Sequence, residues 1–150
     1  MTTLSMSQKL NAQMNLEFCA SHLYVSLSNW CMERNLLRPA LYLRRQAQNC
    51  ITHTMRVFEY MKQTGNYPII KSVNIPTNSI HSIDELLKQA LDNQLLRNYE
   101  LECLAEEARV ETDNPTLILL ADIHAGQKNI PAEIIEQMAE YLSAPVSETC

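Results

Sequence analysis

The stretch Cys50-Ile51-Thr52-His53 decides how this chain is interpreted, together with Glu17 on the preceding helical segment. Four-helix bundles that hold two metal ions place a Glu-x-x-His sequence on one helix and a glutamate on its neighbour. Here the histidine and the spacing are present, but a thiol stands where the bridging carboxylate would be. The pattern predicts a bundle that has kept its fold and lost much of its metal chemistry.

Length and composition restrict the class of protein. The 150 residues suit one domain, expected over 1–150, and two glycines leave few breaks, which favours long helices. The formal net charge of −5 argues against nucleic-acid binding, and no apolar run is long enough to span a membrane. The five cysteines are an odd number scattered through helical pattern, and the first residues lack a secretory signal. We therefore expect a cytoplasmic protein.

Apolar residues recur at helical spacing in four segments. The second segment begins near Pro39, which suits a first helical turn, and Gly65 supplies its C-terminal stop. The third opens with Ser82-Ile83-Asp84-Glu85, a capping-box pattern. We expect an all-α four-helix bundle with helices at about 7–33, 39–64, 82–111 and 115–142.

Two interruptions shape the connections between these helices. Residues 66–81 contain two prolines and an Ile/Val-rich middle, which predicts a long extended crossover between the second and third helices. Gly126 and Pro131 interrupt the fourth segment, and a proline inside a helix removes a backbone donor. We expect the fourth helix to kink or restart there.

The order of short loop, long crossover and short loop resembles the bacterial non-haem ferritins. The resemblance spans essentially the whole chain and implies a ferritin-like four-helix bundle that assembles into a 24-subunit shell. The short fifth helix that this family places at the fourfold channel is expected to be absent, which puts closure of that channel in doubt. The motifs that carry the resemblance are Asn15-Leu16-Glu17, Leu43-Arg44-Arg45, Cys50-x-x-His53, Thr64-Gly65-Asn66 and Pro115-Thr116.

In that family, iron is oxidised at a centre inside each subunit. The resemblance implies carboxylates at 17, 49, 50, 94, 126, 129 and 130, with a histidine at 53, and this chain retains Glu17 and His53. It also places Tyr24 and Gln127 beside the centre; we expect Tyr24 to be a core aromatic that is a remnant of it. Iron is held mainly by hard oxygen ligands, so two-metal oxidation should fail or be very slow. The remaining positions hold Asn49, Cys50, Gln94, Gly126, Asn129 and Ile130.

Two arrangements of the surviving residues stay open. In the first, which we favour, Glu17 and His53 form a metal-free network with Gln127, and Cys50 is an inert core residue. In the second, Glu17, His53 and Cys50 hold one ion, with Gln94 and Gln127 as further ligands. Iron would bind weakly there, whereas the thiol suits zinc.

Three functions remain open. We favour an iron-storage or iron-homeostasis subunit with a largely lost ferroxidase site, which contributes shell or specialised iron handling, alone or beside a competent ferritin subunit. This choice leans against an enzyme. The second is an active ferroxidase that oxidises Fe²⁺ to Fe³⁺ at a reduced or single-metal site. The third is a non-enzymatic stress-response or interaction protein on the same scaffold. The acids from Glu100 to Glu111 are expected on a solvated face, and their direction relative to a cavity is not determined by sequence.

Overall fold

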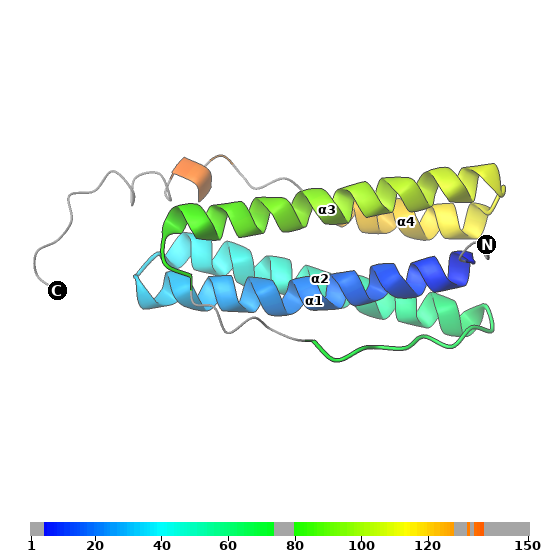
Figure 1. Ribbon diagram of the computed structural model, residues 1–150, viewed down its shortest axis with the longest axis horizontal. Coiled ribbons are helices and arrows are strands. Elements are labelled where there is room, and N and C mark those ends of the chain that lie inside the picture. The colour runs from blue at the N-terminus through cyan, green and yellow to red at the C-terminus, as the bar shows by residue number, and fades with distance from the viewer. Residues whose placement is uncertain (1–4, 74–79, 128–131, 133, 137–150) are drawn as a thin grey trace, which may run out of the picture.

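Four helices lie side by side in the computed structural model, which describes residues 5–73, 80–127, 132 and 134–136 (Figure 1). They are α1 (Met6–Glu33), α2 (Leu37–Gln63), α3 (Ile83–Val110) and α4 (Asn114–Gly126), and the described residues contain no strand. The connection from α2 to α3 leads from one end of the bundle to the other, so α2 and α3 run in the same direction (Figure 1). The predicted all-α bundle with one long crossover is confirmed.

Local sequence signals set the helix ends. Ser5 precedes α1, accepts a hydrogen bond from the backbone N–H of Gln8 and donates its own N–H to the Gln8 side chain. Ser82 caps α3 by accepting from the N–H of Glu85, but the Glu85 carboxylate accepts from the N–H of His81. A capping box predicts that the Glu85 side chain accepts from the N–H of Ser82, but the carboxylate instead accepts from the N–H of the preceding residue, His81. Gly65 has a φ of 80° after α2, a conformation that glycine adopts without strain.

The fourth helix is interrupted where the sequence predicts a kink or restart, and its predicted end at 142 lies outside the described residues. α4 ends at Gly126, and Gln127 has a non-helical φ of −97° and ψ of 86°. This backbone turns the Gln127 side chain into the bundle, where its amide bonds Glu17. Residues 134–136 are helical again, and Ile134 is 8% exposed. The positions 128–131 and 137–150 lie outside the described residues, as does the expectation about a fifth helix.

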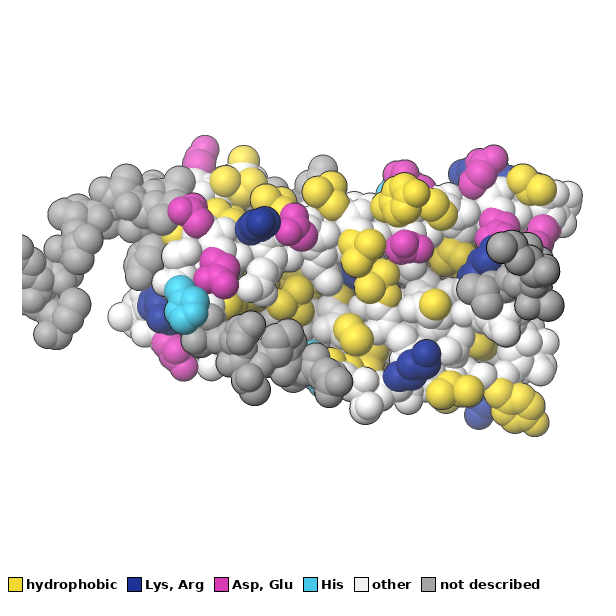
Figure 2. All heavy atoms as spheres, in the orientation of Figure 1, with side chains coloured by type: hydrophobic (Ala, Val, Ile, Leu, Met, Phe, Trp, Pro, Cys, Tyr) yellow, Lys and Arg dark blue, Asp and Glu magenta, His cyan; other side chains and the backbone are white. Residues whose placement is uncertain are grey.

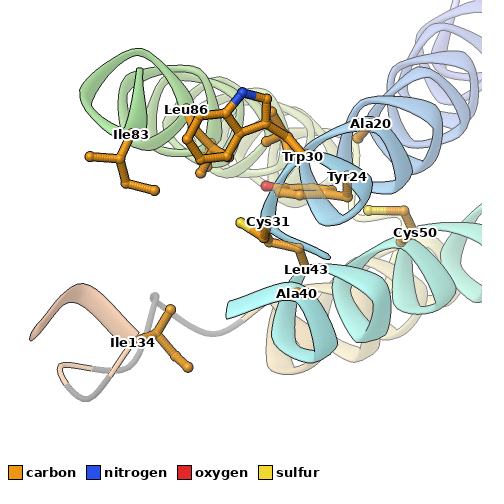
Figure 3. Close-up of a cluster of buried hydrophobic side chains, with 13 residues drawn as sticks. Ala20, Tyr24, Trp30, Cys31, Ala40, Leu43, Cys50, Ile83, Leu86 and Ile134 are labelled. Atoms are coloured by element: carbon orange, nitrogen blue, oxygen red, sulfur yellow. The ribbon is translucent and has the colours of Figure 1, made fainter. Parts of the chain in front are cut away.

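The apolar core is divided into two clusters along the bundle. The first apolar cluster, shown in Figure 3, is centred on side chains such as Tyr24, Leu43 and Leu86 and includes Cys50. The second contains Met14, Val57, Leu101, Leu120 and other residues toward the opposite end. On each of α1, α2 and α3, buried polar residues stand between the stretches that supply the two clusters. A polar layer therefore crosses the middle of the bundle.

Side-chain amides of α1 hold the crossover in place. The N–H of Ile69 donates to Asn11 Oδ1 at 2.7 Å, and Asn15 Nδ2 donates to the Ile69 carbonyl at 2.8 Å. The N–H of Lys71 donates to Asn15 Oδ1 at 2.7 Å. At the far end of the crossover, Trp30 Nε1 donates to the Ile80 carbonyl at 2.8 Å. These hydrogen bonds pair backbone N–H and C=O groups of an extended segment that has no neighbouring strand in the described chain.

The acids of α3 do not share one face. Glu100 and Glu107 line a groove between α1 and α3, and Glu107 pairs with Lys9. Glu102 and Glu106 line a second groove, between α3 and α4. Figure 2 shows acidic and hydrophobic side chains interspersed over this part of the surface. No helix in the described part of the chain is long and apolar enough to cross a membrane.

Candidate functional site

Glu17 of α1 is the centre of the polar layer, which we define as Gln13, Glu17, His53, Arg97 and Gln127. Its side chain is 0% exposed, and it is the only buried carboxylate among the described residues. Oε2 accepts a hydrogen bond from Arg97 Nη1 at 3.1 Å. Oε1 accepts from the side-chain amide of Gln127 and, at 3.5 Å, from Gln13 Nε2. Both carboxylate oxygens are therefore bonded to donors of the protein itself.

Arg97 enters this layer from α3 and is only 3% exposed. Besides Glu17, its Nη1 donates to the Cys50 sulfur at 3.5 Å, and its Nη2 donates to the Tyr24 hydroxyl at 2.9 Å. Its Nε donates to Asn93 Oδ1, one helical turn earlier, at 2.7 Å. One guanidinium thus joins α1, α2 and α3 at the level where the family's metal ligands are expected.

Glu17 and Arg97 hold opposite charges in the polar layer. Burial raises the pKa of Glu17, but the nearby His53 and Arg97 outweigh it and the pKa is lowered overall. Burial also opposes the charge on Arg97, yet Cys50, Glu17 and Tyr24 raise the pKa of its guanidinium. Burial raises the pKa of Cys50 to about 12, so it is a neutral thiol. Glu17 and Arg97 therefore form a pair of one negative and one positive charge.

His53 of α2 lies within ion-pair distance of Glu17 but makes no hydrogen bond to it. The imidazole is 6% exposed, and its Nδ1 is 3.8 Å from Glu17 Oε2, without a hydrogen-bond partner. On the other side, Nε2 faces Gly126, where a Cβ would lie only 2.7 Å away. The buried Oε1 of Gln127 also lacks a partner. Two polar atoms next to the central carboxylate thus lack a hydrogen bond.

The structure brings together most of the residues that the sequence singled out. Glu17, His53 and Gln127 lie in the polar layer, with Tyr24 and Cys50 at its edge. Gln94 is buried on α3, one turn before Arg97, and Asn49 is half-buried on α2. Positions 129 and 130 lie outside the described residues. Within the described ranges, no three His, Cys, Asp or Glu side chains are arranged to hold a metal ion.

Arg97 is the charged residue of the polar layer that the sequence analysis did not single out. It stands on the buried stripe of α3, where Ala90, Gln94, Leu101 and Leu104 recur at spacings of three and four residues. A charged residue on such a stripe must find a buried partner, because an unpaired buried charge is costly. The helical periodicity therefore contained a signal for an internal ion pair, although not for the identity of the partner.

Comparison with known proteins shows the relationship directly. Residues 7–142 match the family model for the ferritin-like domain. A bacterial non-heme ferritin-like protein of Escherichia coli (strain K12) is 38% identical over 150 residues, which are 100% of this chain and 90% of the relative. A bacterial non-heme ferritin of Escherichia coli O6:H1 is 39% identical over 115 residues, which cover 77% of this chain and 70% of that protein.

Solved structures agree with these sequence matches. The ferritin of Chlorobium tepidum superposes with a TM-score of 0.77 at 27% identity, covering 95% of this chain and 87% of that one. An open pore ferritin from Archaeoglobus fulgidus superposes with a TM-score of 0.72 at 23% identity, covering 94% and 84%, which is a likeness of fold. The helical bundle, its long crossover and these matches together show that the chain belongs to the ferritin-like family of iron-storage proteins.

Proposed function

We propose that this protein is an iron-storage-class ferritin subunit whose own internal centre does not oxidise Fe²⁺. The observation that carries the proposal is the ion pair between Glu17, the only buried carboxylate among the described residues, and Arg97. A two-iron centre needs several carboxylates, one of which bridges the ions. Cys50, Gln94 and Gly126 supply none. The described residues do not fit a two-iron centre.

The role left to such a subunit is structural and electrostatic. Each chain has a formal net charge of −5, so a 24-subunit shell would be strongly negative and would draw cations toward its pores and cavity. In this proposal the subunit contributes shell and iron-handling surface, and oxidation is carried out by a competent ferritin subunit in the same shell or by oxygen in solution.

Iron oxidation tests the proposal. Purified protein is mixed aerobically with Fe²⁺, and formation of Fe³⁺ is followed by absorbance. We expect an initial rate no higher than that of buffer, and no rise in melting temperature when Fe²⁺ is added without oxygen, since tight binding to the native state would stabilise it. A ferritin that retains its carboxylates is the positive control. Fast, stoichiometric oxidation would refute the proposal.

Assembly is tested separately. Sedimentation velocity of the full chain, alone and after refolding with a competent ferritin subunit, should show a large closed particle in at least one of the two samples. A stable monomer or dimer in both would remove the shell role and leave the non-enzymatic interaction protein as the better account.

A second candidate is a single-metal ferroxidase or zinc site formed by Glu17, Cys50 and His53, with Gln94 and Gln127 as further ligands. One observation favours it: the unpaired His53 Nδ1 lies 3.8 Å from Glu17 Oε2. That separation suits one ion in contact with both atoms, since such bonds are about 2.0–2.2 Å long. The charge of Arg97 on the same oxygen counts against it.

A further inference from the structure

The Arg97 guanidinium contacts more of the expected metal-ligand set than a simple salt-bridge partner would. Its Nη1 lies 3.1 Å from Glu17 Oε2 and 3.5 Å from Cys50 Sγ, so one nitrogen contacts two side chains of the expected ligand set. Those two groups come from α1 and α2, and the arginine reaches them from α3.

We propose that Arg97 is the resident cation of the polar layer, which takes the place of a metal ion and excludes divalent cations from Glu17, Cys50 and His53. The inference deepens the proposed function and rests on it, because it names the residue that keeps the centre inactive. It also makes a claim that lost carboxylates alone do not make: once the arginine is removed, the surviving donors bind one ion.

Electrostatics explains the exclusion. Arg97 already balances the charge of Glu17, so a divalent ion that approached this carboxylate would be repelled by a fixed positive group. At a separation of about 4 Å and an effective dielectric constant near 20, each unit of like charge costs roughly 4 kcal/mol.

Two buried atoms without hydrogen bonds are the donors that an ion would use once Arg97 is removed. His53 is 6% exposed and its Nδ1, next to Glu17, has no hydrogen-bond partner. The buried Oε1 of Gln127 has none either, although the Gln127 amide nitrogen bonds the same carboxylate. Carboxylate, imidazole and thiolate together are a donor set that suits Zn²⁺ and the chemically similar Co²⁺.

A matched pair of variants separates the charge of Arg97 from its bulk. Lysine and methionine have similar length and an unbranched stem, but only lysine is positive, so Arg97→Lys keeps the cation and Arg97→Met removes it. Each protein is titrated with Co²⁺ without oxygen, and the absorption bands of thiolate-bound cobalt are recorded together with the melting temperature. The variant Arg97→Met/Cys50→Ser is the control for the thiolate bands.

The proposal predicts that Arg97→Met binds one Co²⁺ per chain, with thiolate bands, at least about a hundredfold more tightly than Arg97→Lys or the wild type. The double variant should lose those bands. Should Arg97→Met fail to fold without metal, Arg97→Gln gives the same comparison, because its amide can still donate to Glu17. The inference is overturned if Arg97→Met or Arg97→Gln folds but shows no cobalt bands. It is also overturned if the wild type binds Co²⁺ as tightly as these variants do.

The role of Arg97 and the proposed function fail in different ways. If Arg97→Met and Arg97→Gln show no thiolate–cobalt absorption bands, the proposed role of Arg97 is overturned. The proposed function still holds in that case, because it requires only that the wild type does not oxidise iron. Rapid Fe²⁺ oxidation by the wild type would overturn both.

Discussion

Glu17 and Arg97 form an ion pair of 3.1 Å across the middle of the bundle, and their side chains are 0% and 3% exposed. Eighty positions separate them in the sequence. Two buried charges are stable together only because their mutual attraction offsets the free-energy cost of removing each from water. Removal of either partner therefore leaves an uncompensated charge in the core.

A double-mutant cycle measures this dependence. Glu17→Gln and Arg97→Met should each lower the free energy of unfolding by about 3–5 kcal/mol, and the double variant by clearly less than the sum of the two. Urea denaturation provides the values. The matched control is the surface pair of Arg56 and Asp122, with side chains 47% and 53% exposed, where Asp122→Asn should cost less than about 1 kcal/mol. Additive effects at 17 and 97 would contradict the pairing.

The stability of the protein should depend on pH through Glu17. Its pKa in the folded protein lies below the ordinary value of 4.5, so the stability it contributes is present above about pH 4.5 and is lost as the pH falls through the folded pKa. Urea midpoints measured from neutral pH downward should therefore fall more steeply for the wild type than for Glu17→Gln in that acidic range. Parallel curves for the two proteins would show that Glu17 has an ordinary pKa.

Thiol labelling tests the environment of Cys50. Burial raises the pKa of Cys50 to about 12 and that of Cys31 to about 11, so both should remain neutral and unreactive near pH 8. Cys19 and Cys103 are exposed and should be alkylated by iodoacetamide in the native protein. Peptide mass spectrometry identifies the labelled positions, and labelling in urea controls for intrinsic reactivity. Alkylation of Cys50 as fast as that of Cys103 would show that the polar layer is open.

The contact between Gly126 and His53 can be tested by adding one methyl group. In Gly126→Ala the new Cβ would lie 2.7 Å from His53 Nε2, and we expect a loss of about 1–3 kcal/mol in unfolding free energy. The substitution should cost much less in a His53→Ala background. Gly65→Ala is the control, because nothing lies within 4 Å of its Cβ and its cost, about 1 kcal/mol, comes from the φ of 80°. That cost should not change in the His53→Ala background.

The prediction from sequence was strongest where the determining interactions are local. Helical periodicity, the stop at Gly65 and the cap at Ser82 each depend on residues a few positions apart, and they were enough to predict the four-helix order. The two prolines and the Ile/Val-rich stretch of 66–81 predicted the long crossover for the same reason. The resemblance to ferritins then predicted that Glu17 and His53 share one site, and in the structure His53 Nδ1 lies 3.8 Å from Glu17 Oε2.

The end of the fourth helix required more than local sequence. Gly126 and Pro131 signalled an interruption, but only the fold gives Gln127 its role: this residue leaves the helix and its amide bonds Glu17, more than a hundred positions earlier. The direction of the α3 acids was equally undetermined, since Glu100 and Glu107 face α1 whereas Glu102 and Glu106 face α4.

The sequence by itself determined the helices, their connections and which side chains stand at the positions where the ferritin resemblance implies metal ligands. Only the tertiary structure decided what balances the carboxylate that remains. Arg97 could be recognised as a charge on a buried stripe, but its partners Glu17, Tyr24 and Cys50 lie on two other helices. A buried charge is stabilised by whichever opposite charge the fold brings within a few ångströms, and that proximity is a property of packed helices rather than of neighbouring residues.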